Sequence, residues 1–159
     1  MPKAWMSPDA VDFSLRGARS DVDLFGWYEA EPAGRWSRAA FAEVIIPAPP
    51  GTNGVVMVEL QGRVFGTAVG GPARVRLSAD DGPPVEVLFE NDHFATVQAV
   101  LRFVPAGDRP RNLRLSLMRM DSVSPVEAGE SDDERKIGIF AGRIAFHWNW
   151  NWKAGGEGS

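Results

Sequence analysis

Residues 55–65 read VVMVELQGRVF, and this stretch decides the fold class. Val56, Val58 and Leu60 fall on one side of it and alternate with residues of the other side, which is the two-residue period of a β-strand. Gly62 predicts a bend or a bulge near its end. Similar apolar runs occupy residues 23–29, 35–37, 40–46, 73–78, 85–89, 96–103, 112–120 and 137–148.

These runs recur about every ten residues, without an amphipathic helix or an internal repeat, which predicts an all-β fold. Twelve prolines and 17 glycines fall mostly between them. The loop PAPPGTNG is expected to end the run 40–46, and Asp81-Gly82 is a hairpin signal. We predict an antiparallel two-sheet sandwich, jelly-roll-like, with about eight or nine strands.

One domain fits the length of 159 residues. We expect an N-terminal arm at 1–22 with one edge strand, a β-sandwich domain at 23–152 and a flexible tail at 153–159. The net charge of −4 argues against nucleic acid as a partner. No run approaches the ~20 apolar residues of a membrane span, and no signal peptide is visible. The chain is expected to be soluble, and its localisation is left open.

The sequence FGWYEAEPAGRW carries the first candidate site. On an extended chain Glu29 and Glu31 point to one side, and Arg35 follows closely. The carboxylates could accept hydrogen bonds from sugar hydroxyls while an indole stacks on a sugar ring. The alternative is an ion pair at the edge of the sandwich with the tryptophans in the core. The candidate ligand-binding residues here are Trp27, Glu29, Glu31, Arg35 and Trp36.

An acidic loop near the other end supplies two further candidates, Asp133 and Arg135. If the first and last strands are neighbours, these residues and the Glu31–Arg35 pair could form one charge network. Five carboxylates between residues 127 and 134 match no EF-hand or nonapeptide calcium pattern. The two histidines, His93 and His147, share no metal-ligand spacing, and cysteine is absent. We therefore predict no metal and no cofactor.

Residues 148–152 read WNWNW. In a strand, Trp148, Trp150 and Trp152 would line one face, either as an exposed strip for a sugar or a partner, or as core beneath a sheet. The strip is the candidate surface for a protein partner or for self-association.

Enzyme classes find little support. Glu29 and Glu31 could meet the carboxylate spacing of a glycosidase, but an acid in a solvated loop beside Arg35 is poorly placed to hold its proton. No nucleophile elbow, P-loop or dinucleotide glycine pattern occurs. We predict that the chain is not an enzyme.

Both motifs together resemble a β-sandwich domain of bacterial cell-surface polysaccharide proteins, often appended to glycosyltransferases or phosphoglycerol-transferase-like enzymes. The matching positions are Gly26, Trp27, Glu31, Pro32, Gly34, Arg35, Trp36 and Ser37, then Ser124, Pro125, Glu127, Gly129, Ser131, Asp133, Arg135 and Gly138. Ala33 stands where that family often has an aromatic residue. The resemblance implies a galactose-binding-like sandwich near glycan chemistry.

Our expectation is a non-catalytic carbohydrate-binding or glycan-associated accessory domain of bacterial polysaccharide metabolism. The alternative is a structural or protein-interaction domain that docks through the C-terminal aromatic strip.

Overall fold

A computed structural model of the protein describes residues 9–14, 19–38, 41–64, 71–105, 107–109, 111–120 and 137–151. These residues form ten strands and no helix, so none of them forms a helix long and apolar enough to cross a membrane. The strands are β1 (Asp9–Asp12), β2 (Asp23–Phe25), β3 (Arg35–Arg38), β4 (Phe41–Ala48), β5 (Val55–Arg63), β6 (Ala73–Ala79), β7 (Val85–Phe89), β8 (Ala95–Arg102), β9 (Arg111–Arg119) and β10 (Ile137–Trp148).

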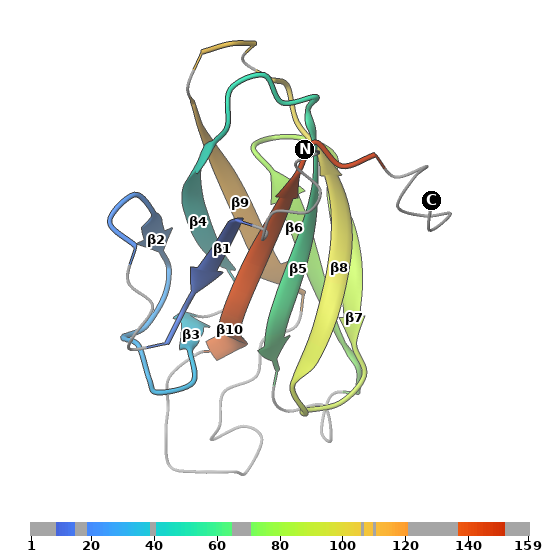
Figure 1. Cartoon of the computed structure of the whole chain (residues 1–159). Coiled ribbons are helices and arrows are strands. Elements are labelled where there is room, and N and C mark those ends of the chain that lie inside the picture. The colour runs from blue at the N-terminus through green and yellow to red at the C-terminus, as the bar shows by residue number, and fades with distance from the viewer. Residues whose placement is uncertain are drawn as a thin grey trace.

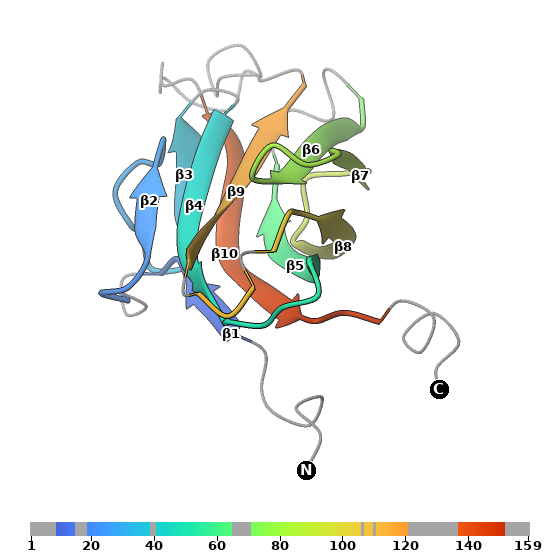
Figure 2. The same cartoon turned by 90° about the horizontal axis from the view of Figure 1, so that it is seen from above.

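Two antiparallel sheets lie face to face (Figures 1 and 2). Sheet A has the order β1-β10-β5-β8, and β3 also pairs with β10. Sheet B has the order β2-β4-β9-β6-β7. The predicted all-β sandwich is confirmed. The described residues form one strand more than the nine predicted runs, because β1, the edge strand expected in the N-terminal arm, pairs with β10.

The core fills the space between the sheets. Alternate residues of the central strands of each sheet point into it, and all are fully buried: Val56, Val58 and Leu60 on β5, Val44 and Ile46 on β4, and Leu113, Leu115 and Leu117 on β9. Burying one face of every strand supplies the main stabilisation of such a fold. The two-residue period predicted for residues 55–60 therefore reflects the burial of one face of β5 in the core.

Strand β4 runs two residues further than predicted, through Pro47 to Ala48. Pro47 has no N–H to donate, but β2 pairs only with residues 43–45 of β4. Among the described residues no strand pairs with Pro47 on that side, so a missing donor there leaves no ladder partner unsatisfied.

The irregularity expected at Gly62 lies in the opposite strand. The register between β10 and β5 shifts between Ala141 and Arg143, which makes Gly142 the extra residue of a bulge. Gly62 is required for a different reason, because a Cβ there would lie 2.3 Å from the carbonyl oxygen of Phe140.

Strand β10 organises the region in which the candidate site lies. One of its edges pairs with β5, and the other pairs with β3 at residues 137–141 and with β1 at residues 143–146. The arm predicted at 1–22 thus contributes β1 to sheet A. The N-proximal motif and the start of the last strand are neighbours, as the sequence suggested.

Candidate functional site

Residues 26–38 form a hairpin that we call the 26–38 hairpin. Its arms are joined by a bridge between Trp27 and Ser37 and by a hydrogen bond from the Tyr28 N–H to the Trp36 carbonyl at 2.9 Å. At the tip, the Glu31 N–H donates to the Gly34 carbonyl at 2.7 Å. The second arm is β3, whose pairing with β10 fixes the hairpin to sheet A.

Inward-facing residues anchor this hairpin. Trp27 is only 7% exposed, lies 4.8 Å from the ring of Phe13 and donates its indole N–H to the Glu43 carbonyl at 3.0 Å. Ser37 is fully buried, and its hydroxyl accepts from the Ile139 N–H at 2.9 Å. The indole of Trp27 therefore belongs to the core and offers no face to a ligand, as our alternative expected for this residue.

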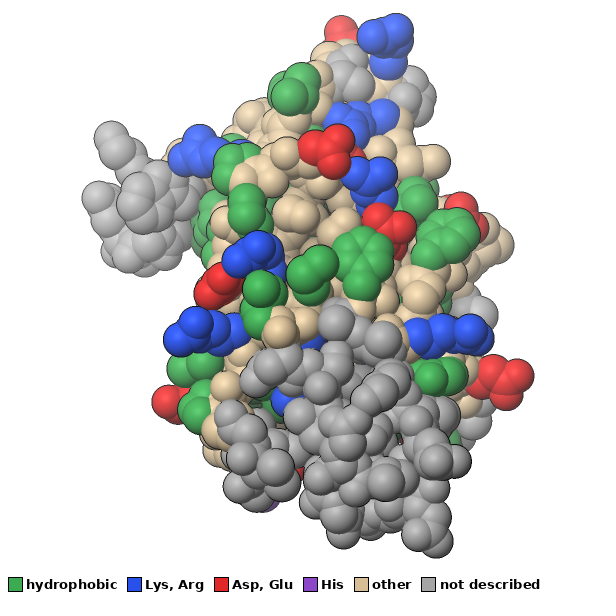
Figure 3. Space-filling view, turned by 180° about the vertical axis from the view of Figure 1, so that it is seen from behind, with side chains coloured by type: hydrophobic (Ala, Val, Ile, Leu, Met, Phe, Trp, Pro, Cys, Tyr) green, Lys and Arg blue, Asp and Glu red, His purple; other side chains and the backbone are tan. Residues whose placement is uncertain are grey.

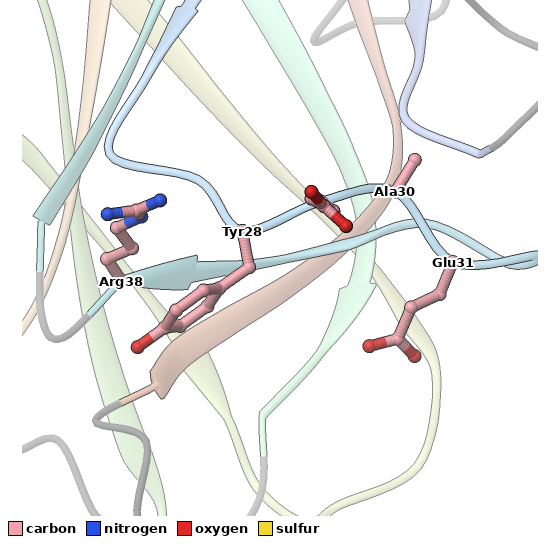
Figure 4. Close-up of a pocket in the computed structure, with 5 residues that line it drawn as sticks. Tyr28, Ala30, Glu31 and Arg38 are labelled. Atoms are coloured by element: carbon pink, nitrogen blue, oxygen red, sulfur yellow. The ribbon is translucent and has the colours of Figure 1, made fainter.

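On its outer side the hairpin forms an open depression of about 420 Å³, which we call the hairpin depression (Figure 4). Its lining residues are Tyr28, Glu29, Ala30, Glu31 and Arg38. The guanidinium carbon of Arg38 lies 5.1 Å from the centre of the Tyr28 ring, and its Nε donates to the Trp27 carbonyl. Glu29 is exposed and Glu31 is half-buried. The depression combines an aromatic ring, two carboxylates and a cation.

An aromatic cluster adjoins the depression on the outer face of sheet A. Trp36 lies opposite Tyr28 in the hairpin, and its ring is 4.9 Å from that of Phe140. Phe94 meets Phe140 edge-on at 5.8 Å and is 52% exposed. We call Trp36, Phe94 and Phe140 the outer aromatic cluster. Arg63 covers it, with its guanidinium 5.6 Å from the centre of the Trp36 ring.

The predicted charge network is only partly visible. Among the described residues, Glu31 and Arg35 form no ion pair, and Arg35 instead donates to the Tyr28 carbonyl at 3.4 Å. Asp133, Arg135 and Trp152 lie outside the described residues, so their part in a site stays a prediction.

Sequence reasoning missed five contributors to this surface: Tyr28, Arg38, Arg63, Phe94 and Phe140. Arg38 follows Trp36 by two residues, so a strand pattern could have placed it on the same face. Phe94 and Phe140 are 46 positions apart in sequence, and only the pairing of β10 and β8 with β5 brings them together. The sequence around either residue does not indicate this contact.

A polar row crosses the same face beyond the cluster. Glu59 accepts from the Gln98 amide at 2.8 Å and lies 2.5 Å from His147. The hydrogen bond from Gln98 is the main reason that the pKa of Glu59 lies below its ordinary value. The hydrogen bond and charge of His147 and the charge of Arg143 lower the pKa further, and partial burial opposes them. This carboxylate is therefore ionised at neutral pH and already has its partners.

Trp148 and Trp150 do not share a face. Trp148 stacks on Phe146 at 5.6 Å and packs against the core, and its indole N–H donates to Asp9 at 3.1 Å. Strand β10 ends there, because Asn149 has a φ of +56°. Trp150 then contacts His147, which points to the outer face. The predicted common face was wrong for this pair, because the alternation stops at Asn149.

Within the described part of the chain, no group of three or more His, Cys, Asp or Glu side chains is placed to hold a metal ion.

No protein-family model matches the sequence, and no curated protein does. Among solved structures, the chain is similar to the mosquito-larvicidal Cry4Aa toxin of Bacillus thuringiensis, with a TM-score of 0.50 and 10% identity. That match covers 84% of this chain and 22% of the toxin, so this chain spans about a fifth of the toxin's length. The low identity makes the likeness evidence of fold alone.

Two carbohydrate-binding modules are similar at lower scores. The CBM22-2 xylan-binding domain of Paenibacillus barcinonensis Xyn10C has a TM-score of 0.48 at 10% identity, covering 88% of this chain and 98% of that one. A family 35 carbohydrate-binding module from Clostridium thermocellum has a TM-score of 0.42 at 12% identity, covering 86% and 97%. Each match covers nearly the whole of the other protein's chain, and we base no functional argument on either.

Proposed function

We propose that this protein is a non-catalytic carbohydrate-binding accessory domain whose glycan lies in the hairpin depression and against the outer aromatic cluster. The observation that carries the proposal is the composition of the depression, where the Tyr28 ring, two carboxylates and Arg38 line one open space of about 420 Å³. Sugars present hydroxyl groups at their edges and apolar C–H faces, so they suit a surface of this mixed kind.

The rigidity of the hairpin supports this proposal. Its inner side is fixed by the buried Trp27 and Ser37, and its second arm is a strand of sheet A. The outer side chains are therefore held in place before a ligand arrives, which lowers the entropy lost on binding. The resemblance of the two sequence motifs to a bacterial cell-surface polysaccharide domain supports a role in bacterial polysaccharide metabolism.

The same geometry favours binding over hydrolysis. A glycosidase needs one carboxyl group shielded so that it keeps its proton at neutral pH. Glu29 is exposed, so it lacks the shielding that such an acid requires. We therefore assign Glu29 and Glu31 as acceptors for sugar hydroxyls.

We expect the Tyr28→Ala variant to bind glycan about three- to tenfold more weakly, the effect of losing one aromatic contact. Tryptophan fluorescence, titrated with a panel of neutral and acidic bacterial polysaccharides, would first find a ligand and then compare the variants. Phe25→Ala is the control, because Phe25 is an exposed aromatic residue on sheet B that does not line the hairpin depression. Equal affinities for the two variants, or no binding by the wild type to any polysaccharide, would contradict the proposal.

A second candidate function, protein interaction, is favoured by a different surface. The outer face of sheet B carries an exposed apolar patch among charged side chains, and Figure 3 looks onto this face. Phe41 and Met118 are direct cross-strand partners at its centre, and Phe25 lies one strand further on. The patch could bind a second copy of the chain, and it is a different surface from the docking strip predicted at Trp148, Trp150 and Trp152.

For this second candidate we expect sedimentation velocity to show a dimer at high protein concentration, and Phe41→Ser to shift it to monomer. Leu88→Ser is the control, since Leu88 is similarly exposed but lies on the edge strand β7. A wild-type protein that stays monomeric at every concentration would remove self-association through the patch.

A further inference from the structure

We propose that the glycan is acidic, and that Arg63 binds the carboxylate of a uronic acid residue. This inference rests on the proposed function and names the ligand class of the same surface. It starts from a feature that a neutral sugar would not require: a half-buried guanidinium that has an aromatic neighbour but no anionic one among the residues that the structure describes.

Arg63 is the last residue of β5 and lies opposite Phe140 of β10. Its guanidinium reaches across the cluster to Trp36, where it lies 5.6 Å from the ring centre. Among the described residues, the buried Nε atom has no hydrogen-bond partner and the side chain forms no ion pair. Contact with the indole orients the planar group but does not neutralise its charge.

A cation in this position is costly unless an anion approaches it, because burial removes part of its hydration. A carboxylate matches the planar fork of a guanidinium and accepts two parallel hydrogen bonds. Arg63 is preorganised for such a ligand, since the contact with Trp36 has already restricted its rotamers.

The other charges on this face agree with a single anionic group near Arg63. Arg143 lies on the same face, opposite Gln61 and one row along from Arg63. The nearest carboxylate along β5, Glu59, is already held by Gln98 and His147. Glu29 and Glu31 lie in the hairpin depression, where they would repel an acid and accept from hydroxyls. A uronic acid residue at Arg63 and neutral sugars at the hairpin would fit this separation.

The test compares uronate-containing polysaccharides with their carboxyl-reduced forms, which keep the sugar chain but lose the charge. The probes are polygalacturonate, alginate, glucuronoxylan and hyaluronan, and the readouts are affinity and its dependence on salt. We expect at least one uronate form to bind about tenfold more tightly than its reduced form at low salt, with the difference shrinking as salt screens the charge.

Variants assign the effect to Arg63. Arg63→Gln should remove the preference for the uronate form over the reduced form, and Arg63→Lys should retain part of that preference. Arg102→Gln is the control, because Arg102 lies on the same sheet face at the far end of β8 and loses the same charge. Thermal melts of each variant show whether it is folded.

The outcomes separate the two proposals. If reduced and uronate forms bind equally, or if Arg63→Gln and Arg102→Gln behave alike, the assignment of Arg63 is wrong while carbohydrate binding stands. If neither form of any polysaccharide binds, the proposed function fails and this inference fails with it.

Discussion

The Trp27→Ala variant is expected to lose about 3–5 kcal/mol of its free energy of unfolding, the usual cost of truncating a buried tryptophan. Trp27 is 7% exposed, packs on Phe13 and satisfies the Glu43 carbonyl with its indole N–H. Removing it leaves a cavity between the hairpin and the core, and an acceptor without its donor. Urea denaturation followed by circular dichroism measures the loss.

A conservative variant separates the stability role of Trp27 from a ligand role. Trp27→Phe keeps an aromatic ring beside Phe13 but loses the hydrogen bond to Glu43, so it should cost about 1–3 kcal/mol. Because the indole does not reach the surface, the folded variant should bind any glycan as the wild type does. A Trp27→Ala loss below about 1 kcal/mol, or a Trp27→Phe defect in binding alone, would contradict the placement of Trp27 in the core.

Sequence patterns predicted the strands well wherever one face of a strand is buried. The run 85–89 coincides with β7, where alternation of apolar and polar residues reflects burial of one face. The run 137–148 coincides with β10, a mostly apolar strand whose residues 138–141 and 144–146 are all buried. Prediction was less accurate at the end of β4, where the position of Pro47 beyond the reach of β2 permits the strand to continue. Strand ends depend on which neighbours are present, and one sequence does not carry that information.

The candidate site was harder to predict, because the hydropathy of the residues in β3 does not match their burial. A simple pattern would bury Trp36 and expose Ser37, whereas Ser37 is buried and Trp36 lies on the outer face. The Ser37 hydroxyl can be buried because it accepts from the Ile139 N–H, a partner 102 residues away. Two tryptophans of one motif thus have opposite roles, Trp27 in the core and Trp36 in the proposed glycan surface.

The same limit applies to the C-terminal tryptophans. Perfect alternation from Trp148 onward predicts one continuous face, but only for as long as the backbone stays extended. The left-handed conformation at Asn149 turns the chain, and the Asn149 side chain then accepts from the Asn53 N–H at 2.7 Å. Asparagine adopts this conformation more readily than most residues. The two asparagines between the indoles could therefore have indicated that the strand ends there.

The second large effect is expected at the tip of the hairpin, where Gly34→Ala should cost about 3 kcal/mol. The cause is steric. A Cβ on Gly34 would lie 2.1 Å from the Ala141 carbonyl oxygen and 2.9 Å from the ring of Phe140, and a strand backbone cannot move away cheaply. The hairpin would have to lift from β10, which would also displace Tyr28 and weaken glycan binding.

Gly142→Ala provides the matched control for Gly34→Ala, because Gly142 lies in the bulge of β10 against the same hairpin. Its Cβ would be 3.3 Å from the Ala33 carbonyl oxygen and 3.4 Å from the Phe94 ring, distances that small shifts can relieve. We expect a cost below about 1 kcal/mol there. Urea denaturation of both variants tests the difference. Equal losses would mean that the hairpin is not packed against Ala141, and the hairpin depression would then lack the support that orients Tyr28 and Arg38.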